Sequence, residues 1–182
     1  MKVYRTEITP LLFLERAEHV YERRIGAIYG RRRLSYGELG TRSRRLAAAL
    51  AGAGIRRGDR VAFLAPNVPA LLDAHFGVAL AGAVLVAINT RLNAEEVGYI
   101  LEHSGSRLLF VDAELARGVT DLRKQTPLVE RTITIDDPEF APGIERTFDG
   151  PEYEEFIDVT PATAQWRTSD EEDVYSINYT SG

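Results

Sequence analysis

The chain has 182 residues, 45% of them apolar, which is enough for one hydrophobic core and an ordinary globular fold. It has no cysteine, which excludes disulfides and thiolate metal sites, and no apolar run long enough to cross a bilayer. The net charge of −5 is uneven, because residues 1–60 carry 14 basic and 6 acidic side chains, whereas residues 61–182 carry 8 and 21. No signal-peptide core follows the first residues, and these features together favour a cytoplasmic protein.

The first part of the chain predicts a helix followed by a β-hairpin. Thr9 is expected to cap the helix and Pro10 to occupy its first position, and apolar residues then recur at helical spacing as far as Tyr21. Residues 27–29 and 33–35 are rich in β-formers and flank a Gly-Arg-Arg turn, which indicates a small hairpin.

A long amphipathic helix is expected next. Ser35 and Glu38 have the spacing of a capping box, in which the serine oxygen accepts from a free backbone N–H and the glutamate reaches back to the cap. Apolar residues line one face, and arginines such as Arg42 lie toward the other, solvated face. The segment Gly52-Ala53-Gly54 ends this helix. It fails as a dinucleotide fingerprint, because it follows a helix instead of a strand and lacks a third glycine.

Strands and helices then alternate along the chain. The predicted strands are 60–65, 84–88, 107–111 and 132–135, and the predicted helices are 70–81, 94–103 after the N-cap Asn93 with Glu96 as its capping-box partner, and 114–124. The strands are almost continuously apolar, as in a parallel sheet covered on both faces. We therefore predict an α/β fold with a mostly parallel sheet flanked by helices on both faces, in addition to the hairpin.

The alternation is lost in residues 136–173, where prolines, glycines and acidic residues dominate. We expect an irregular acidic surface excursion there, with one short helix near Tyr153–Ile157. A strand over residues 174–179 then returns to the sheet.

The last three residues are the main chemical candidates. Thr180, Ser181 and Gly182 follow a predicted strand and offer two hydroxyls and backbone N–H groups, which small residues leave accessible to an anion. This arrangement is typical of the start of a phosphate-binding loop. Taken alone, the tripeptide favours an ordinary C-terminal tail.

A family resemblance changes that balance. The segment Ile177-Asn178-Tyr179-Thr180-Ser181-Gly182 resembles the start of the phosphate loop of the adenylate-forming enzymes, which include the acyl-CoA synthetases and whose motif reads Tyr-Thr-Ser-Gly-Thr-Thr-Gly-x-Pro-Lys-Gly. Upstream matches occur in the family's order at residues 34–39, 58–62, 66–67, 82–89, 93–101 and 109–112. The resemblance covers nearly the whole chain and is closest to medium- and long-chain fatty acid ligases.

The resemblance implies that residues 1–182 are the incomplete N-terminal domain of an AMP-binding ligase, truncated inside the phosphate loop. In the family reaction a carboxylate and ATP give acyl-adenylate and pyrophosphate, and CoA then gives acyl-CoA and AMP. Thr180, Ser181 and Gly182 would hold the β- and γ-phosphates, usually with Mg²⁺. The remaining adenine, metal and catalytic residues of the family would follow Gly182.

The implied partners are a carboxylic acid, expected to be a fatty acid, together with ATP and CoA. Neither nucleic acid nor a transmembrane segment is expected, and a homodimer is possible because the family often dimerises through this domain. The 182-residue chain alone is expected to have no ligase activity.

Other candidate groups have simpler interpretations. The acidic groups Asp136-Asp137, Glu154-Glu155 and Glu171-Glu172-Asp173 contain residue types that serve in acid–base catalysis or bind Mg²⁺. Neighbouring loop carboxylates need not converge, so solvated charge is the better interpretation. His75, in an apolar helix, is expected to be packed and hydrogen-bonded.

Two further alternatives stay open. A stand-alone binding or interaction module would reuse the fold without ligase activity. The arginine-rich residues 23–60 suggest nucleic-acid binding as a second alternative, but no aromatic stacking motif accompanies them. Solvated turn and helix faces are the simpler interpretation of this charge.

Overall fold

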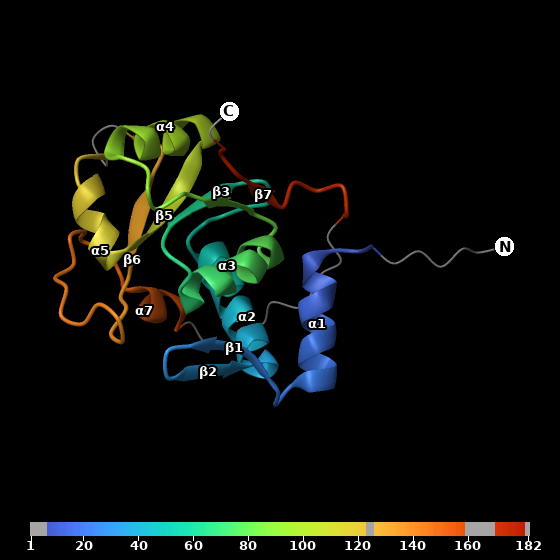
Figure 1. Cartoon of the computed structure of the whole chain (residues 1–182). Coiled ribbons are helices and arrows are strands. Elements are labelled where there is room, and N and C mark those ends of the chain that lie inside the picture. Colours follow the sequence, from blue (N-terminus) through green and yellow to red (C-terminus); the bar gives the residue numbers. More distant parts are fainter. Residues whose placement is uncertain (1–6, 123–125, 159–169, 181–182) are drawn as a thin grey trace.

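The computed structural model describes residues 7–122, 126–158 and 170–180. Within them the chain forms a five-stranded parallel sheet in the order β6-β5-β3-β4-β7 and a separate antiparallel hairpin, β1-β2 (Figure 1). The sheet strands are β3 (Arg60–Leu64), β4 (Val84–Ala87), β5 (Ser106–Asp112), β6 (Arg131–Ile135) and β7 (Ser176–Ile177), and the hairpin strands are β1 (Ile25–Tyr29) and β2 (Arg32–Ser35). The predicted α/β class and the predicted hairpin are confirmed.

Helices cover both faces of the sheet, as predicted. They are α1 (Pro10–Tyr21), α2 (Tyr36–Gly52), α3 (Pro69–Leu80), α4 (Ala94–Ser104), α5 (Ala113–Ala116), the 3₁₀ turn η1 (Arg117–Val119) and α7 (Tyr153–Ile157). Figure 1 shows α4 and α5 on one side of the sheet and α2, α3 and α7 on the other. No helix within the described ranges is both long enough and apolar enough to cross a membrane.

The central strand β3 divides its side chains between two cores. Val61 and Phe63 point into the core shared with α2, α3 and α7, and Ala62 and Leu64 into the core shared with α4 and α5. This is the period-two alternation of a strand that is buried on both faces. Phe63 stacks on Phe110 of β5 with ring centroids 4.3 Å apart. Burying one such side chain contributes about 2–3 kcal/mol to folding.

Both predicted capping boxes are present. At the start of α2, the Ser35 hydroxyl accepts from the Glu38 N–H at 3.2 Å, and the Glu38 carboxylate accepts from the Ser35 N–H at 2.7 Å. Asn93 and Glu96 make the same pair of bonds at 3.0 and 2.9 Å at the start of α4. These bonds satisfy backbone donors that have no partner inside the helix.

Three local predictions were wrong. Thr9 precedes α1, but its side chain makes no capping bond; the Leu12 N–H instead bonds the Thr9 carbonyl at 3.1 Å. The helix predicted over 114–124 is interrupted: α5 ends at Ala116, the 3₁₀ turn η1 with the poor helix former Gly118 follows, and Leu122 is again α-helical. Part of its predicted range, residues 123–125, lies outside the described residues.

The strand predicted over 174–179 is also shorter, since only Ser176 and Ile177 pair with β4. β7 is the last strand of the five-stranded sheet in the described chain and has β4 as its single neighbour there. An edge strand of this kind has a ladder on one side only, which favours a short pairing.

Candidate functional site

The predicted phosphate residues lie just beyond β7. Thr180 is exposed, and Ser181 and Gly182 lie outside the described residues. β7 runs parallel to β4, with Ile177 opposite Val86, so its carboxyl end points the same way as those of the other strands. In open α/β sheets ligands bind at the carboxyl ends of the strands.

The residue before Thr180 is fastened to helix α4. Tyr179 is partly buried against the core on the α4 side of the sheet, and its hydroxyl lies 2.8 Å from Nδ1 of His103 in the last turn of α4. Burial raises the pKa of Tyr179, so the phenol stays protonated. Sequence reasoning missed His103, because a histidine near the end of a helix carries no signal for a partner 76 residues away.

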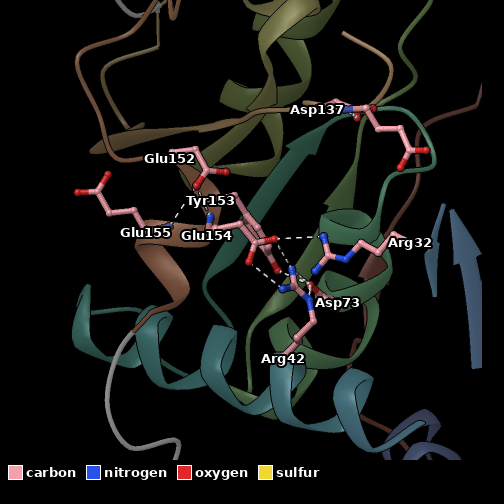
Figure 2. Close-up of polar contacts among 9 residues, drawn as sticks. Arg32, Arg42, Asp73, Asp137, Glu152, Tyr153, Glu154 and Glu155 are labelled. Carbon is pink, nitrogen blue, oxygen red and sulfur yellow. Dashed lines mark hydrogen bonds and ion pairs between the residues drawn. The ribbon is translucent and has the colours of Figure 1, made fainter. Parts of the chain in front are cut away.

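A second polar group, the buried ion network of Arg42, Asp73, Tyr153 and Glu154, joins α2, α3 and α7 (Figure 2). Arg42 Nε donates to Asp73 Oδ2 at 2.8 Å, and its Nη1 and Nη2 atoms donate to the two Glu154 oxygens at 2.7 and 2.8 Å. The Tyr153 hydroxyl donates to the same Asp73 oxygen at 2.9 Å. The guanidinium therefore bridges carboxylates from two different helices.

Burial sets the electrostatics of this network. Asp73 has no exposed side-chain surface, and burial raises its pKa to about 6, although Arg42 and Tyr153 oppose the rise. Burial also raises the pKa of Tyr153, with the charge of Asp73 adding to the effect. For Glu154, burial acts in the opposite direction, but the hydrogen bond from Arg42 leaves its pKa lowered.

The network has a structural role and joins helices, instead of forming a site for a substrate. Arg42 has 11% of its side chain exposed, and Tyr153 is buried with its ring edge-on to that of Phe110, so a substrate would have to displace packed side chains to reach Asp73. Its bonds instead hold α7, which lies in the middle of the acidic excursion, against helices α2 and α3. The prediction of a solvated Arg42 was therefore wrong, whereas Glu154 and Glu155 are exposed as expected, Glu154 with half of its side chain in solvent while it pairs with Arg42.

Other acidic residues of the excursion also bind within the chain. Asp136 pairs with Arg146 at 2.8 Å, and Asp137 accepts a hydrogen bond from the Tyr29 hydroxyl of the hairpin. Near the end of the chain, Asp173 pairs with Arg57 at 2.6 Å. The acidic pairs thus hold loops in place. In the part of the chain that the structure describes, no three histidine, aspartate or glutamate side chains gather as a metal site would require.

His75 differs from its prediction. Its imidazole is exposed and makes no hydrogen bond to another described residue, while its backbone carbonyl accepts from the Tyr175 hydroxyl. The side chain borders an apolar cavity of about 280 Å³ between the hairpin and the start of α3. None of the hydrogen bonds between described residues involves its ring nitrogens, so we assign it no chemistry.

Comparison with known proteins gives a consistent result. Residues 14–182 match the AMP-binding enzyme family. The chain is 38% identical to a peroxisomal butyrate–CoA ligase of Arabidopsis thaliana, covering 96% of this chain and 32% of the relative. It is also 38% identical to a peroxisomal trans-cinnamate:CoA ligase of Petunia hybrida, covering 96% and 33%.

Solved structures agree with these relatives. An anthranilate CoA ligase in complex with anthranoyl-AMP superposes with a TM-score of 0.86 at 26% identity, covering all of this chain and 33% of the other. A fatty acyl CoA synthetase of Mycobacterium tuberculosis gives 0.80 at 29% identity, covering 94% and 32%. The chain therefore spans about a third of the length of the relatives it matches.

Proposed function

Because the chain belongs to the AMP-binding enzyme family, we propose that it serves as the N-terminal part of an ATP-dependent acyl-CoA ligase. The complete enzyme would convert a carboxylate and ATP to acyl-adenylate and pyrophosphate, and would then form acyl-CoA and AMP. One observation carries the proposal: 96–97% of the chain aligns with about a third of the length of each of three relatives that are named as CoA ligases. On this proposal residues 1–182 are an incomplete domain whose phosphate loop continues beyond Gly182.

We assign Thr180, Ser181 and Gly182 to the start of that loop. The exposure of Thr180, three residues beyond the end of a strand of the parallel sheet, supports the assignment. Hydroxyl and backbone N–H donors at this place would hold the β- and γ-phosphates and stabilise the pyrophosphate leaving group. We assign no residue of the described chain to Mg²⁺ or to CoA.

The acid activated is proposed to be a fatty acid. The match to the mycobacterial fatty acyl CoA synthetase supports this choice. Other relatives are named as ligases of butyrate, benzoate and cinnamate, so any test must include these acids as alternative substrates. The cytoplasm is our proposed location, although several relatives are named as peroxisomal enzymes. A homodimer stays a prediction.

The experiment is an assay of the complete ligase with ATP, Mg²⁺, CoA and a panel of acids running from acetate to palmitate, with benzoate and cinnamate included. We expect pyrophosphate release and thioester formation, with the highest kcat/KM for a fatty acid. A preference for an aromatic acid would refute the substrate but keep the reaction. If no acid gives a thioester, the interaction-module alternative replaces the ligase.

The 182-residue chain alone tests whether ligase activity and ATP binding require the rest of the proposed enzyme. It should form no acyl-CoA and bind ATP only weakly, because three residues supply few of the donors that a triphosphate needs. Calorimetric titration with Mg·ATP measures the affinity. Thioester formation by the purified chain would show that the chain is catalytically sufficient, contrary to this proposal.

A further inference from the structure

We propose that His103 is a positioning residue for the phosphate loop, acting through its hydrogen bond to Tyr179. This inference rests on the proposed function, because it gives the His103–Tyr179 pair a role only if Thr180 begins a phosphate site. His103 itself would touch no substrate. It would fix the backbone from which the phosphate-binding residues start.

The pair is placed for this role. The Tyr179 hydroxyl lies 2.8 Å from His103 Nδ1, with either atom as donor according to the histidine tautomer, and the two rings meet edge to face with centroids 5.8 Å apart. Ile177 and Tyr179 both pack on the core below α4. Two residues apart, they lie on the same side of an extended segment, whose successive side chains point to opposite sides. Holding Tyr179 against α4 therefore turns the next side chain, Thr180, away from α4.

His103, the partner of Tyr179 on α4, is itself held by neighbouring residues. Tyr99, one turn earlier on α4, stacks on the His103 ring at 5.3 Å, so the imidazole lies between two aromatic rings. The end of α4 is in turn bound to strand β3, because Arg60 donates to the carbonyls of Ser104 and Gly105 at 2.6 and 3.0 Å. The contact at Tyr179 is thereby connected to the central strand of the sheet.

Few other bonds within the described residues hold the segment that follows β7. β7 contributes two residues to the ladder, and its pairing with β4 ends at Ile177. Beyond that point, the Tyr179 hydroxyl connects residues 178–180 to the end of α4, through His103 and through a side-chain hydrogen bond with Ser104. A phosphate site needs its donors held to within a fraction of an ångström, so losing this bond should weaken the ATP site in particular.

The test uses matched variants of the complete ligase. Tyr179→Phe removes only the hydroxyl that bonds His103, and His103→Leu removes its partner. His103→Asn restores a hydrogen-bonding group near the position of Nδ1. Tyr99→Phe is the control, because it removes a hydroxyl from the neighbouring exposed ring without removing either partner of the His103–Tyr179 hydrogen bond, and it preserves the ring that stacks on His103.

We expect Tyr179→Phe and His103→Leu to raise the KM for ATP about three- to tenfold, the effect of one lost hydrogen bond. The KM values for the acid and for CoA should stay unchanged. His103→Asn should recover most of the affinity for ATP, and Tyr99→Phe should behave as wild type. Equal effects on all three substrates, or a change no larger than that of Tyr99→Phe, would overturn the proposal.

A measurement without turnover separates this inference from the proposed function. Hydrogen–deuterium exchange, followed by mass spectrometry of the peptide covering residues 174–180, should be faster in Tyr179→Phe and His103→Leu than in Tyr99→Phe. If exchange is faster in these two variants but the complete enzyme has no ligase activity, the proposed function is refuted and the anchoring role is retained. Unchanged exchange would refute the anchoring role whether or not the enzyme is active.

Discussion

Arg42 and Asp73 lie on adjacent helices, and both the Nε and Nη2 atoms of Arg42 approach the same Asp73 oxygen, Oδ2, to 2.8 Å. The other oxygen, Oδ1, is buried and has no hydrogen-bond partner among the described residues. All the hydrogen bonds that Asp73 accepts from the described residues therefore go to a single carboxylate oxygen, Oδ2. Arg42 must offset most of the cost of burying this charge, which makes it a critical residue of the interface between α2 and α3.

Replacing Arg42 with methionine should lower the free energy of unfolding by about 3–5 kcal/mol, because it leaves a buried carboxylate without its cation. Urea unfolding followed by circular dichroism measures the change. Arg45→Met, at an exposed position of the same helix, should alter stability by less than about 0.5 kcal/mol.

The double variant Arg42→Met/Asp73→Leu distinguishes the loss of a charge pair from the loss of packing. Removing both charges should restore much of the stability lost by Arg42→Met. A double variant as unstable as the single one would show that packing, and not the unpaired charge, accounts for the loss.

The raised pKa of Asp73 predicts a dependence of stability on pH. Its pKa is about 6 in the folded chain and 3.8 in the unfolded reference, so between these values the folded chain binds more protons. Stability should therefore fall as the pH rises from about 4 to about 6, by ~3 kcal/mol for this group. Arg42 stays charged throughout, and Glu154, whose pKa is lowered, contributes in the opposite direction.

Asp73→Asn isolates this contribution, since the variant keeps every other titrating group. Urea midpoints measured every half pH unit should converge for the two proteins near pH 4 and diverge toward pH 6.5, with the variant gaining relative to wild type. Parallel profiles would mean that Asp73 titrates alike in the folded and unfolded chains.

The parts of the fold that could be predicted depend on local patterns. The capping boxes at Ser35 and Asn93 need only residues three positions apart, and the apolar run of β3 shows its burial on both faces directly. The short pairing of β7 could not be predicted in the same way. β-propensity extends over residues 174–179, but the length of the ladder is set by the neighbour that pairs with it.

The buried ion network could not be predicted either, because it too depends on which distant segments pack together. Glu154 lies 112 residues from Arg42, in a segment whose composition is typical of a solvated loop. Arg42 lies on a helix where the apolar stripe indicated a different buried face, and the arginine stem allows a buried position beside it. A charge pattern along one element does not show which charges a second element will cover.

Two glycines provide a test of helix packing. A Cβ built on Gly77 in α3 would come within 2.9 Å of Leu46 Cβ and of the Ser43 carbonyl oxygen in α2, so Gly77→Ala should destabilise the chain by about 1–3 kcal/mol. At Gly52, near the end of α2, nothing lies within 4 Å. Gly52→Ala should instead stabilise by roughly 0.5 kcal/mol, because alanine lowers the entropy of the unfolded chain.

Thermal unfolding of the two variants in one buffer gives the comparison. Opposite signs are expected, since the substitution is the same and only the surroundings differ. If both variants are stabilised, α2 and α3 lie farther apart than the close approach at Gly77 indicates.

Arg60 gives a test of how the end of α4 is held. Its guanidinium reaches the carbonyls of Ser104 and Gly105, and Gly105 has the left-handed φ of 63° that ends the helix. Lysine carries the same charge but lacks the planar fork that spans two acceptors. Arg60→Lys should therefore cost about 1–2 kcal/mol, the contribution of a charged hydrogen bond to those carbonyls.

The exposed Arg131, which begins β6 as Arg60 begins β3, is the matched control for this substitution. Arg131→Lys should leave the urea midpoint unchanged. Arg60→Lys should also speed amide exchange in the last turn of α4, because loss of the second carbonyl contact loosens that turn. A loss of stability without faster exchange there would place the contribution of Arg60 within β3 instead of at the end of α4.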